Sequence, residues 1–318
     1  MYNTLPELVK DKRSVRDIIA ASLDAQMEAD PRVCYLDADL MNCIGTRKLV
    51  AKYPHRAINC GIAESNMIGV AAGMSAAGMI PYAHTFGIFA SRRVMDQAFL
   101  SVAYAKLNVR VLGSDPGVTA AMNGGTHMPF EDMAPYLAIP KAIAVEACDC
   151  AQAASIMEQV KDLYGLIYIR FMRKNPVAVY PDGTKFEIGK GALLRDGDDV
   201  TLMASGIMVA ESLKAADMLA AEGISARVID MFTWKPIDAA LIEESARKTG
   251  AIVTAENHNY LSGLGAQVAE VVTSTYPVPV MRVGVEDEFG EVGPEDYLRK
   301  RFEMTAEKVV QKAKAEIG

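Results

Sequence analysis

Short apolar, strand-like runs alternate with longer helix-like segments along this 318-residue chain. Parallel strands need crossover connections, and helices supply them, so this alternation predicts mainly parallel sheets covered by helices. The first half has strand-like runs at 32–36, 56–59, 80–84, 109–113, 142–145 and 166–170, with helical patterns at 14–27, 64–77, 89–106 and 150–163. The fold class expected from this rhythm is α/β, with two consecutive domains.

A segment rich in proline and glycine interrupts the rhythm between residues 175 and 190. It contains Pro176 and Gly189, with the turn sequence Pro181-Asp182-Gly183 between them. We interpret 176–189 as a linker between a first domain, 1–175, and a second, 190–318. The second has strand-like runs at 200–204, 226–229, 251–255 and 278–283 and helical patterns at 209–222, 263–274 and 305–316. Arg195-Asp196-Gly197-Asp198 is interpreted as a turn.

Composition argues against several classes of partner. The net charge is −7 and no run of more than three lysines and arginines occurs, which disfavours nucleic acid and anionic membranes. The five cysteines lack metal-type spacing, because Cys148-x-Cys150 is one residue too tight. Residues 1–16 are too polar for a signal peptide, and no apolar run reaches the length of a membrane span. We expect a reduced, cytoplasmic setting.

Glu64 is the carboxylate with the most unusual surroundings. It follows Gly61 and opens a helical segment that is made almost wholly of apolar and small residues. A carboxylate at the start of such an element is poorly solvated and suited to sharing a proton with a ring nitrogen. On spacing alone, however, a glutamate in a first helical turn is more often there to balance the helix dipole.

Other candidate residues follow strands, where α/β proteins bind ligands. Phe86 and Phe89 come after the run at 80–84, and His127 lies in the loop Asn123-Gly124-Gly125-Thr126-His127. Asp39 follows the first strand, and Arg173 follows the last strand of the first half. Each also has a simpler interpretation: the phenylalanines as core residues, His127 as a turn cap, Asp39 as a solvated acid, and Arg173 as a basic edge of the linker.

Taken in order, Glu64, Thr85-Phe86-Gly87-Ile88-Phe89, Gly125-Thr126-His127 and Arg173-x-Asn175 resemble the transketolase family. The resemblance implies a thiamine diphosphate pyrimidine-binding domain followed by a transketolase C-terminal domain. It implies transfer of a two-carbon ketol unit between sugar phosphates, with Glu64 and His127 as catalytic residues. It places Asp39, Ile62, Glu64, Phe86 and Phe89 at the cofactor, and Ser114, Asn123, His127 and Arg173 at the substrate. The family's glutamate bonds a nitrogen of the cofactor's aminopyrimidine ring, and its phenylalanines enclose that ring.

Half of a full transketolase has no counterpart in this sequence. The family's Gly-Asp-Gly and following Asn, which hold a divalent metal and the cofactor's phosphates, are absent. The resemblance therefore implies an N-terminal partner subunit that carries Mg²⁺ (or Ca²⁺), and assembly into a heterotetramer. Ser114 stands where many relatives have histidine, which leaves the donor sugar open. Arg13 or Arg16 is a further candidate for a phosphate contact.

Three other functions share some of these features. The beta subunit of a 2-oxo-acid dehydrogenase has the same two domains and glutamate, and a deoxyxylulose phosphate synthase is a related possibility. The Gly-Gly-Thr-His loop and Arg173 favour a phosphosugar substrate instead. A non-catalytic scaffolding subunit is compatible with Ser114 but does not explain Glu64, Phe86 and Phe89.

Overall fold

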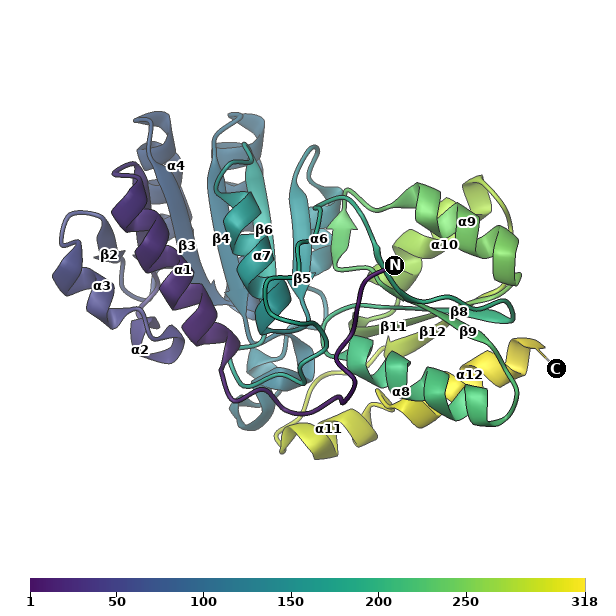
Figure 1. Cartoon of the computed structure of the whole chain (residues 1–318). Helices are drawn as coiled ribbons and strands as arrows, with labels where there is room; N and C mark the ends of the chain where they lie inside the picture. Colours follow the sequence, from purple (N-terminus) through teal and green to yellow (C-terminus); the bar gives the residue numbers. More distant parts are fainter. Residues whose placement is uncertain (318) are drawn as a thin grey trace.

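The computed structural model describes residues 1–317 as two sheets that lie side by side, each flanked by helices (Figure 1). The predicted α/β class with mainly parallel strands is confirmed. The first sheet has the order β10-β5-β6-β4-β3-β1-β2, and the second has the order β12-β11-β8-β9-β7.

In the first sheet, six strands come from the first half of the chain and pair in parallel. They are β1 (Val33–Asp37), β2 (Ala57–Asn59), β3 (Ile80–Phe86), β4 (Val109–Ser114), β5 (Ile143–Ala147) and β6 (Leu166–Phe171). Every residue of β3, β4 and β6 is buried, which explains why these strands read as continuous runs instead of alternating patterns.

Helices of the first half form two hydrophobic cores with this sheet. In one core α1 (Val15–Ala29) packs against α7 (Cys150–Val160), and in the other α4 (Glu64–Ala76) packs against the π-helix η1 (Gln97–Tyr104). Ser14 and Asp149 cap α1 and α7 by accepting backbone N–H bonds. Shorter elements are α2 (Met41–Ile44), α3 (Arg47–Lys52), α5 (Gly87–Arg92), η2 (Gly117–Asn123), η3 (Gly125–His127) and α6 (Met133–Ala138).

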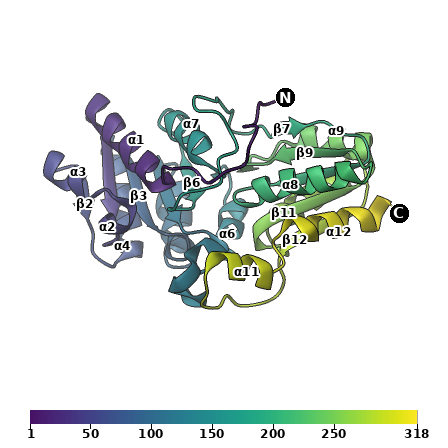
Figure 2. The same cartoon turned by 60° about the horizontal axis from the view of Figure 1, so that its bottom comes forward.

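The second sheet is built in the same way. Its strands are β7 (Ala192–Arg195), β8 (Val200–Ala204), β9 (Ala226–Asp230), β11 (Ile252–Asn259) and β12 (Val280–Val285), of which β7 is antiparallel to β9. Helices α8 (Met208–Ala221) and α12 (Ala306–Ile317) lie side by side (Figure 2), and α9 (Ala239–Thr249) packs against α10 (Leu264–Ser274). The last short helix is α11 (Glu295–Arg301). Within residues 1–317, no helix has both the length and the apolarity to cross a bilayer.

The single helix predicted at 89–106 is wrong. Helix α5 ends at Arg92, a turn at Arg93 and Val94 follows, and the chain continues into η1. The Ser65 hydroxyl donates a hydrogen bond to the Arg93 carbonyl, so that carbonyl has a partner outside the helical ladder. A helix can break where a side chain inserts into its ladder in this way.

One strand crosses between the two units. The segment β10 (Thr233–Lys235) belongs to the second half of the chain but pairs antiparallel with β5 at the edge of the first sheet. It was not predicted, since three residues are too few for a period to be recognised. Because of β10, the two sheets are joined by backbone hydrogen bonds as well as by the linker.

An ion cluster is buried beside this junction. The Arg170 guanidinium lies 2.9 Å from an Asp132 carboxylate oxygen and 2.5 Å from one of Glu146. It also donates to the Asn257 carbonyl at 2.9 Å, while Ser205 donates to Glu146 at 2.7 Å, so the cluster includes both units. The five side chains are buried. Burial raises the pKa of Glu146, and the Arg170 charge opposes that rise.

A second buried carboxyl, Asp230 at the end of β9, has no cation beside it among residues 1–317. It accepts hydrogen bonds from the Tyr180 hydroxyl of the linker and the Gln152 amide of α7, both at 2.7 Å. Burial raises the pKa of Asp230 from 3.8 to about 7, and the two hydrogen bonds oppose this. The folded protein therefore binds a proton here at pH values where the unfolded chain has lost it.

This proton predicts a pH-dependent contribution to stability. The contribution is complete below about pH 4 and is lost as the pH rises through about 7, the folded-state pKa. We expect the unfolding free energy of the wild type, relative to D230N, to fall by roughly 1–3 kcal/mol between pH 5 and pH 8. Urea denaturation of both proteins across this range checks it. His258, whose pKa burial lowers to about 4, titrates in both proteins and cancels in the difference. If the difference in unfolding free energy between the wild type and D230N does not vary with pH, the raised pKa of Asp230 is contradicted.

Candidate functional site

The predicted site residues gather at the carboxyl-terminal edge of the first sheet. Phe86 ends β3, Ser114 ends β4, and Arg173 follows β6 by two residues. Because β6, β4 and β3 are neighbours, with Phe86, Ser114 and Phe171 in register, these ends lie next to one another. Glu64 begins α4, beyond the end of β2. This edge is where open α/β sheets bind ligands.

Glu64 is nearly enclosed, with only 4% of its surface exposed. Gly61 has a φ of 72°, a conformation that glycine adopts readily, and it turns the chain from β2 toward α4. The Glu64 carboxylate receives a charged hydrogen bond from the guanidinium of Arg93, with Nη1 2.8 Å from Oε1. Sequence reasoning missed Arg93, which falls within the segment 89–106 that was predicted to be one continuous helix.

Three rings form a cluster beside Glu64. The centroid of His127 lies 5.3 Å from that of Phe89 and 6.0 Å from that of Phe86, with both pairs edge to face. The two phenylalanine rings are 6.2 Å apart. The Thr126 hydroxyl lies 2.9 Å from Nδ1 of His127 and orients the imidazole. The other ring nitrogen, Nε2, has no hydrogen-bond partner within residues 1–317. The cluster can enclose a planar ring and present a proton-transfer group next to it.

Arg173 forms the far side of the cluster. Its guanidinium lies over the Phe86 ring, 4.9 Å from the ring centre. Its Nε forms an ion pair with Asp115 at 2.5 Å, but the N–H is not aligned for a hydrogen bond with the carboxylate. Burial raises the pKa of Asp115, and Arg173 offsets part of that rise. Among the described residues, the terminal nitrogens of Arg173 have no hydrogen-bond partner, so its fork remains available for an anion. Asp115 was not predicted.

Three other predicted residues lie on loops at the same edge. Asp39 has a φ of 65° and accepts a hydrogen bond from the Asn59 amide at 2.8 Å. Ile62 is 76% exposed, an unusual position for a large apolar side chain, and Asn123 is exposed at the end of η2. Two residues earlier, Ala121 has a φ of 48°, which stores backbone strain in the loop that carries His127.

Ser114 is buried beneath this edge. It lies 3.1 Å from Nε2 of His84, whose Nδ1 is 2.8 Å from a carboxylate oxygen of Asp37. The order serine, histidine, aspartate is that of hydrolase triads. All three side chains have no exposed surface, so no substrate reaches the hydroxyl and the arrangement is a structural relay across β4, β3 and β1.

Neither arginine near the N-terminus contacts the ring cluster. Arg13 pairs with Asp11 at 2.9 Å and with Asp182 of the linker at 2.8 Å. Arg16 donates to the Cys43 carbonyl at 3.3 Å and is partly exposed beside α2. With two carboxylates already bound to Arg13, Arg16 is the freer of the two to bind an added anion.

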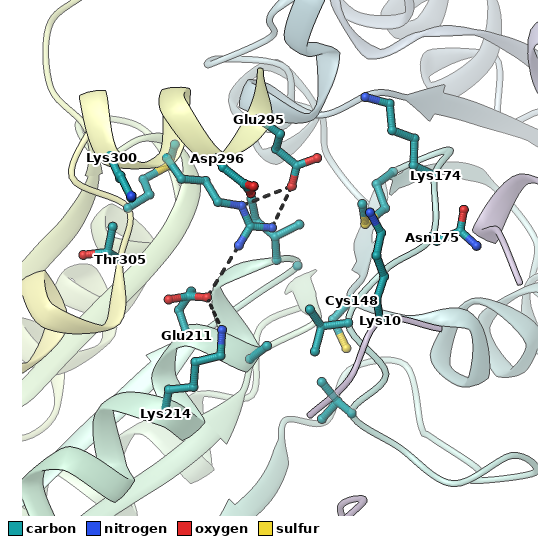
Figure 3. A pocket seen from close by; sticks show the side chains of 18 of the residues that line it. Lys10, Cys148, Lys174, Asn175, Glu211, Lys214, Glu295, Asp296, Lys300 and Thr305 are labelled. Atoms are coloured by element: carbon teal, nitrogen blue, oxygen red, sulfur yellow. Dashed lines mark hydrogen bonds and ion pairs between the residues drawn. The ribbon is translucent and has the colours of Figure 1, made fainter. Parts of the chain in front are cut away.

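A large cavity lies away from this edge. It has a volume of about 570 Å³ and is lined by residues of both units, among them Lys10, Lys174, Glu211 and Arg299 (Figure 3). Glu211 is paired there with Lys214 at 2.8 Å. Glu64, Phe86, Phe89 and His127 do not line it. The candidate site is therefore separate from this cavity.

The edge of the first sheet fits one half of thiamine diphosphate. The planar guanidinium of Arg93 already lies against Phe89 and donates to Glu64, which demonstrates that a flat N–H donor can occupy this position. Within residues 1–317, no group of three or more His, Cys, Asp or Glu side chains could hold a metal ion. The residues around Glu64 and Phe89 therefore fit the aminopyrimidine ring.

Comparison with known proteins identifies two domains in the chain. Residues 11–177 match the family model of the transketolase pyrimidine binding domain, and residues 189–309 match that of the transketolase C-terminal domain. Together these models cover most of the chain.

Individual relatives are similar over most of their length. The 6-deoxy-6-sulfo-D-fructose transketolase subunit SqwH of Clostridium sp. (strain MSTE9) is 47% identical over 307 residues, 96% of this chain and 95% of the relative. An apulose-4-phosphate transketolase subunit of Phocaeicola vulgatus is 32% identical over 90% of this chain and 86% of the relative. A solved structure described as a split gene transketolase, inactive beta4 tetramer, is 40% identical with a TM-score of 0.89, and covers 96% of this chain and 98% of the other.

The chain belongs to the transketolase family. Within this family it is a C-terminal subunit of the split kind, a component of a thiamine-diphosphate-dependent enzyme that transfers ketol groups.

Proposed function

We propose that this chain, assembled with a separate N-terminal subunit, transfers a two-carbon ketol unit between sugar phosphates in the cytoplasm. The observation that carries the proposal is the cluster of Glu64, Phe86, Phe89 and His127, with Arg173 at its far side. The five free cysteines agree with a reducing compartment.

Each residue of the cluster has a role that suits its surroundings. Bound thiamine diphosphate supplies a carbon nucleophile and an electron sink. Glu64 would hold a proton on the aminopyrimidine ring, and its burial keeps that hydrogen bond strong. Phe86 and Phe89 would exclude water from the ring, with Asp39 and Ile62 as further contacts to the cofactor. His127 would move protons on the oxygens of the substrate.

The substrate would enter past the loop of His127. The fork of Arg173 would bind the terminal anion of the sugar, since its ion pair with Asp115 uses Nε and leaves the terminal nitrogens available. Asn123, exposed on the same loop, would contact the sugar hydroxyls. Ser114, predicted at the substrate, would instead support this edge from below through its buried contacts with His84 and Asp37.

The other half of the site would come from the partner subunit. That subunit would hold Mg²⁺ or Ca²⁺ with the diphosphate, since this sequence lacks the family's Gly-Asp-Gly and following Asn, and residues 1–317 contain no group of three or more His, Cys, Asp or Glu side chains that could bind a metal. The active assembly would then be a heterotetramer with each cofactor between subunits. The solved relative described as an inactive beta4 tetramer agrees with C-terminal subunits that associate but are inactive without a partner.

A sulfonated ketose is a second candidate donor. The SqwH relative, 47% identical, is described as acting on 6-deoxy-6-sulfo-D-fructose. A sulfonate presents three oxygens to a guanidinium as a phosphate does, so Arg173 suits either anion.

The test is ketol transfer by this chain alone and by this chain mixed with an N-terminal split-transketolase subunit. Both receive thiamine diphosphate and Mg²⁺, with xylulose 5-phosphate or 6-deoxy-6-sulfofructose as donor and ribose 5-phosphate or glyceraldehyde 3-phosphate as acceptor. We expect activity only in the mixture, and the ratio of kcat/KM for the two donors identifies the natural one.

Other outcomes change the proposal in defined ways. Activity in the unmixed chain would mean that it has its own diphosphate site. A mixture that associates and binds the cofactor but oxidises pyruvate or branched 2-oxo acids, with no ketol transfer, would indicate the 2-oxo-acid dehydrogenase reaction. Tight association of the two subunits without binding of thiamine diphosphate would favour the non-catalytic scaffolding function.

A further inference from the structure

The side chain of Arg93 occupies the space between Glu64 and Phe89. Its guanidinium carbon lies 3.7 Å from the centre of the Phe89 ring, whereas the other cation–aromatic contacts in residues 1–317 span 4.5–5.7 Å. Its Nη1 donates to Glu64 at 2.8 Å. A flat group thus lies on the aromatic face and offers an N–H to the carboxylate.

These two contacts are the same ones that an aminopyrimidine ring would need at this site. The ring is also planar, would stack on a phenylalanine, and would share a proton with Glu64. Arg93 and the ring cannot both occupy this space, since 3.7 Å is the thickness of one stacked group.

We propose that Arg93 is a stand-in for the cofactor ring: it fills the ring site in the free subunit and is displaced when thiamine diphosphate binds. This inference rests on the proposed function, because it takes the cluster of Glu64 and Phe89 to be the ring site. It adds a competition between a side chain of the protein and the cofactor.

Without a cofactor, the site needs such an occupant. Glu64 is 4% exposed, and an enclosed carboxylate without a partner is costly. The charge of Arg93 satisfies it, and the guanidinium covers a phenylalanine face that would otherwise be in contact with water.

Arg93 is also placed to leave. Its carbonyl is held by the Ser65 hydroxyl, so the backbone is attached to the start of α4. The side chain is 47% exposed and begins in the turn between α5 and η1, outside both helices. It can therefore rotate into solvent while the backbone stays in place.

Competition of this kind reduces the apparent affinity for the cofactor. If Arg93 occupies the ring site most of the time, removing its side chain should tighten binding by about three- to tenfold, given the strength of a half-exposed ion pair with stacking. A residue that merely orients Glu64 for the cofactor would have the opposite effect, because its loss would weaken binding.

The experiment titrates thiamine diphosphate, at saturating Mg²⁺, into the assembly of this chain with an N-terminal subunit, and follows binding by calorimetry. The proteins are wild type, R93A, R93K and the control R92A. Arg92 is the neighbouring residue and the last residue of α5. It pairs with Glu131 at 3.1 Å and not with Glu64. We expect tighter binding for R93A, an intermediate affinity for R93K, which keeps the charge but stacks poorly, and an unchanged affinity for R92A.

A second measurement needs no cofactor. In the free chain, R93A should lower the unfolding temperature by about 1–3 °C, and this loss should be absent in a background that already contains E64Q, because the two residues act as a pair. If R93A does not fold, R93K supplies both readouts.

The outcomes separate this inference from the proposed function. Cofactor binding by the wild type together with weaker or equal binding by R93A would overturn the stand-in role and leave the function intact. A wild-type assembly that binds no thiamine diphosphate would overturn both. Independent effects of E64Q and R93A in the free chain would also exclude the stand-in.

Discussion

Replacing Glu64 by glutamine lowers kcat of the assembled enzyme by roughly 10²- to 10⁴-fold at saturating thiamine diphosphate, the range that loss of a positioned proton-transfer group produces. Glutamine has nearly the shape of glutamate and can hydrogen-bond a ring nitrogen, but it cannot hold a shared proton there. Because Glu64 is 4% exposed, water cannot take over this role. The expected loss is therefore in turnover more than in cofactor binding.

Two measurements isolate this effect. Titration calorimetry determines the cofactor affinity of E64Q, so that kcat is compared at full occupancy. Proton NMR then follows the exchange of the acidic ring proton of the cofactor with D₂O, which should slow by a similar factor. Glu131→Gln is the matched control, since Glu131 is partly exposed and pairs with Arg92, which ends α5 next to Arg93. Near-normal turnover in E64Q would mean that the proton is held by another group.

Replacing Arg170 by methionine is expected to destabilise the folded chain by about 3–5 kcal/mol, because it leaves two buried carboxylates without a counter-charge. Asp132 and Glu146 both lie in direct contact with the guanidinium, at 2.9 and 2.5 Å, and all three side chains are at most 1% exposed. The carbonyl of Asn257 loses its donor as well, so the contact between the two units is weakened. Urea denaturation of the free chain measures the loss.

Arg227 provides a matched control for this substitution. Its side chain is only 2% exposed, but its partners Asp196 and Glu244 are 52% and 62% exposed, so R227M leaves both acids in water. We expect R227M to cost about 1 kcal/mol. A triple variant, R170M with D132N and E146Q, should recover part of the stability lost in R170M. Equal losses in R170M and R227M would show that the buried charges are not the cause.

Much of the fold follows from local patterns. The predicted strands match β1 to β6 within a few residues, because each is short, apolar and bounded by turns. Glu64, Phe86, Phe89, His127 and Arg173 could be grouped in advance, because their order along the chain resembles that of the transketolase family. Their roles remain predictions that the substitutions above test.

The features that were missed depend on contacts between distant segments. The turn at Arg93 is fixed by a hydroxyl 28 positions away, which no periodicity reveals. Ser114 gave no indication that His84 and Asp37 would surround it, because the three lie on different strands. Likewise, Arg170 appeared to be the end of a buried strand, and only the packing of both units makes it the centre of an ion cluster.

Strand β10 has a consequence for fragments of this chain that contain only the first unit. Three residues of the second unit close the edge of the first sheet, so the first unit alone would present β5 as a bare edge, open to pairing with other chains. Proteolytic nicking in the linker would leave the fragments attached, whereas a ribosome that stops at the linker would release an aggregation-prone product. The first unit therefore depends on the second to close its sheet, although each unit has a sheet of its own.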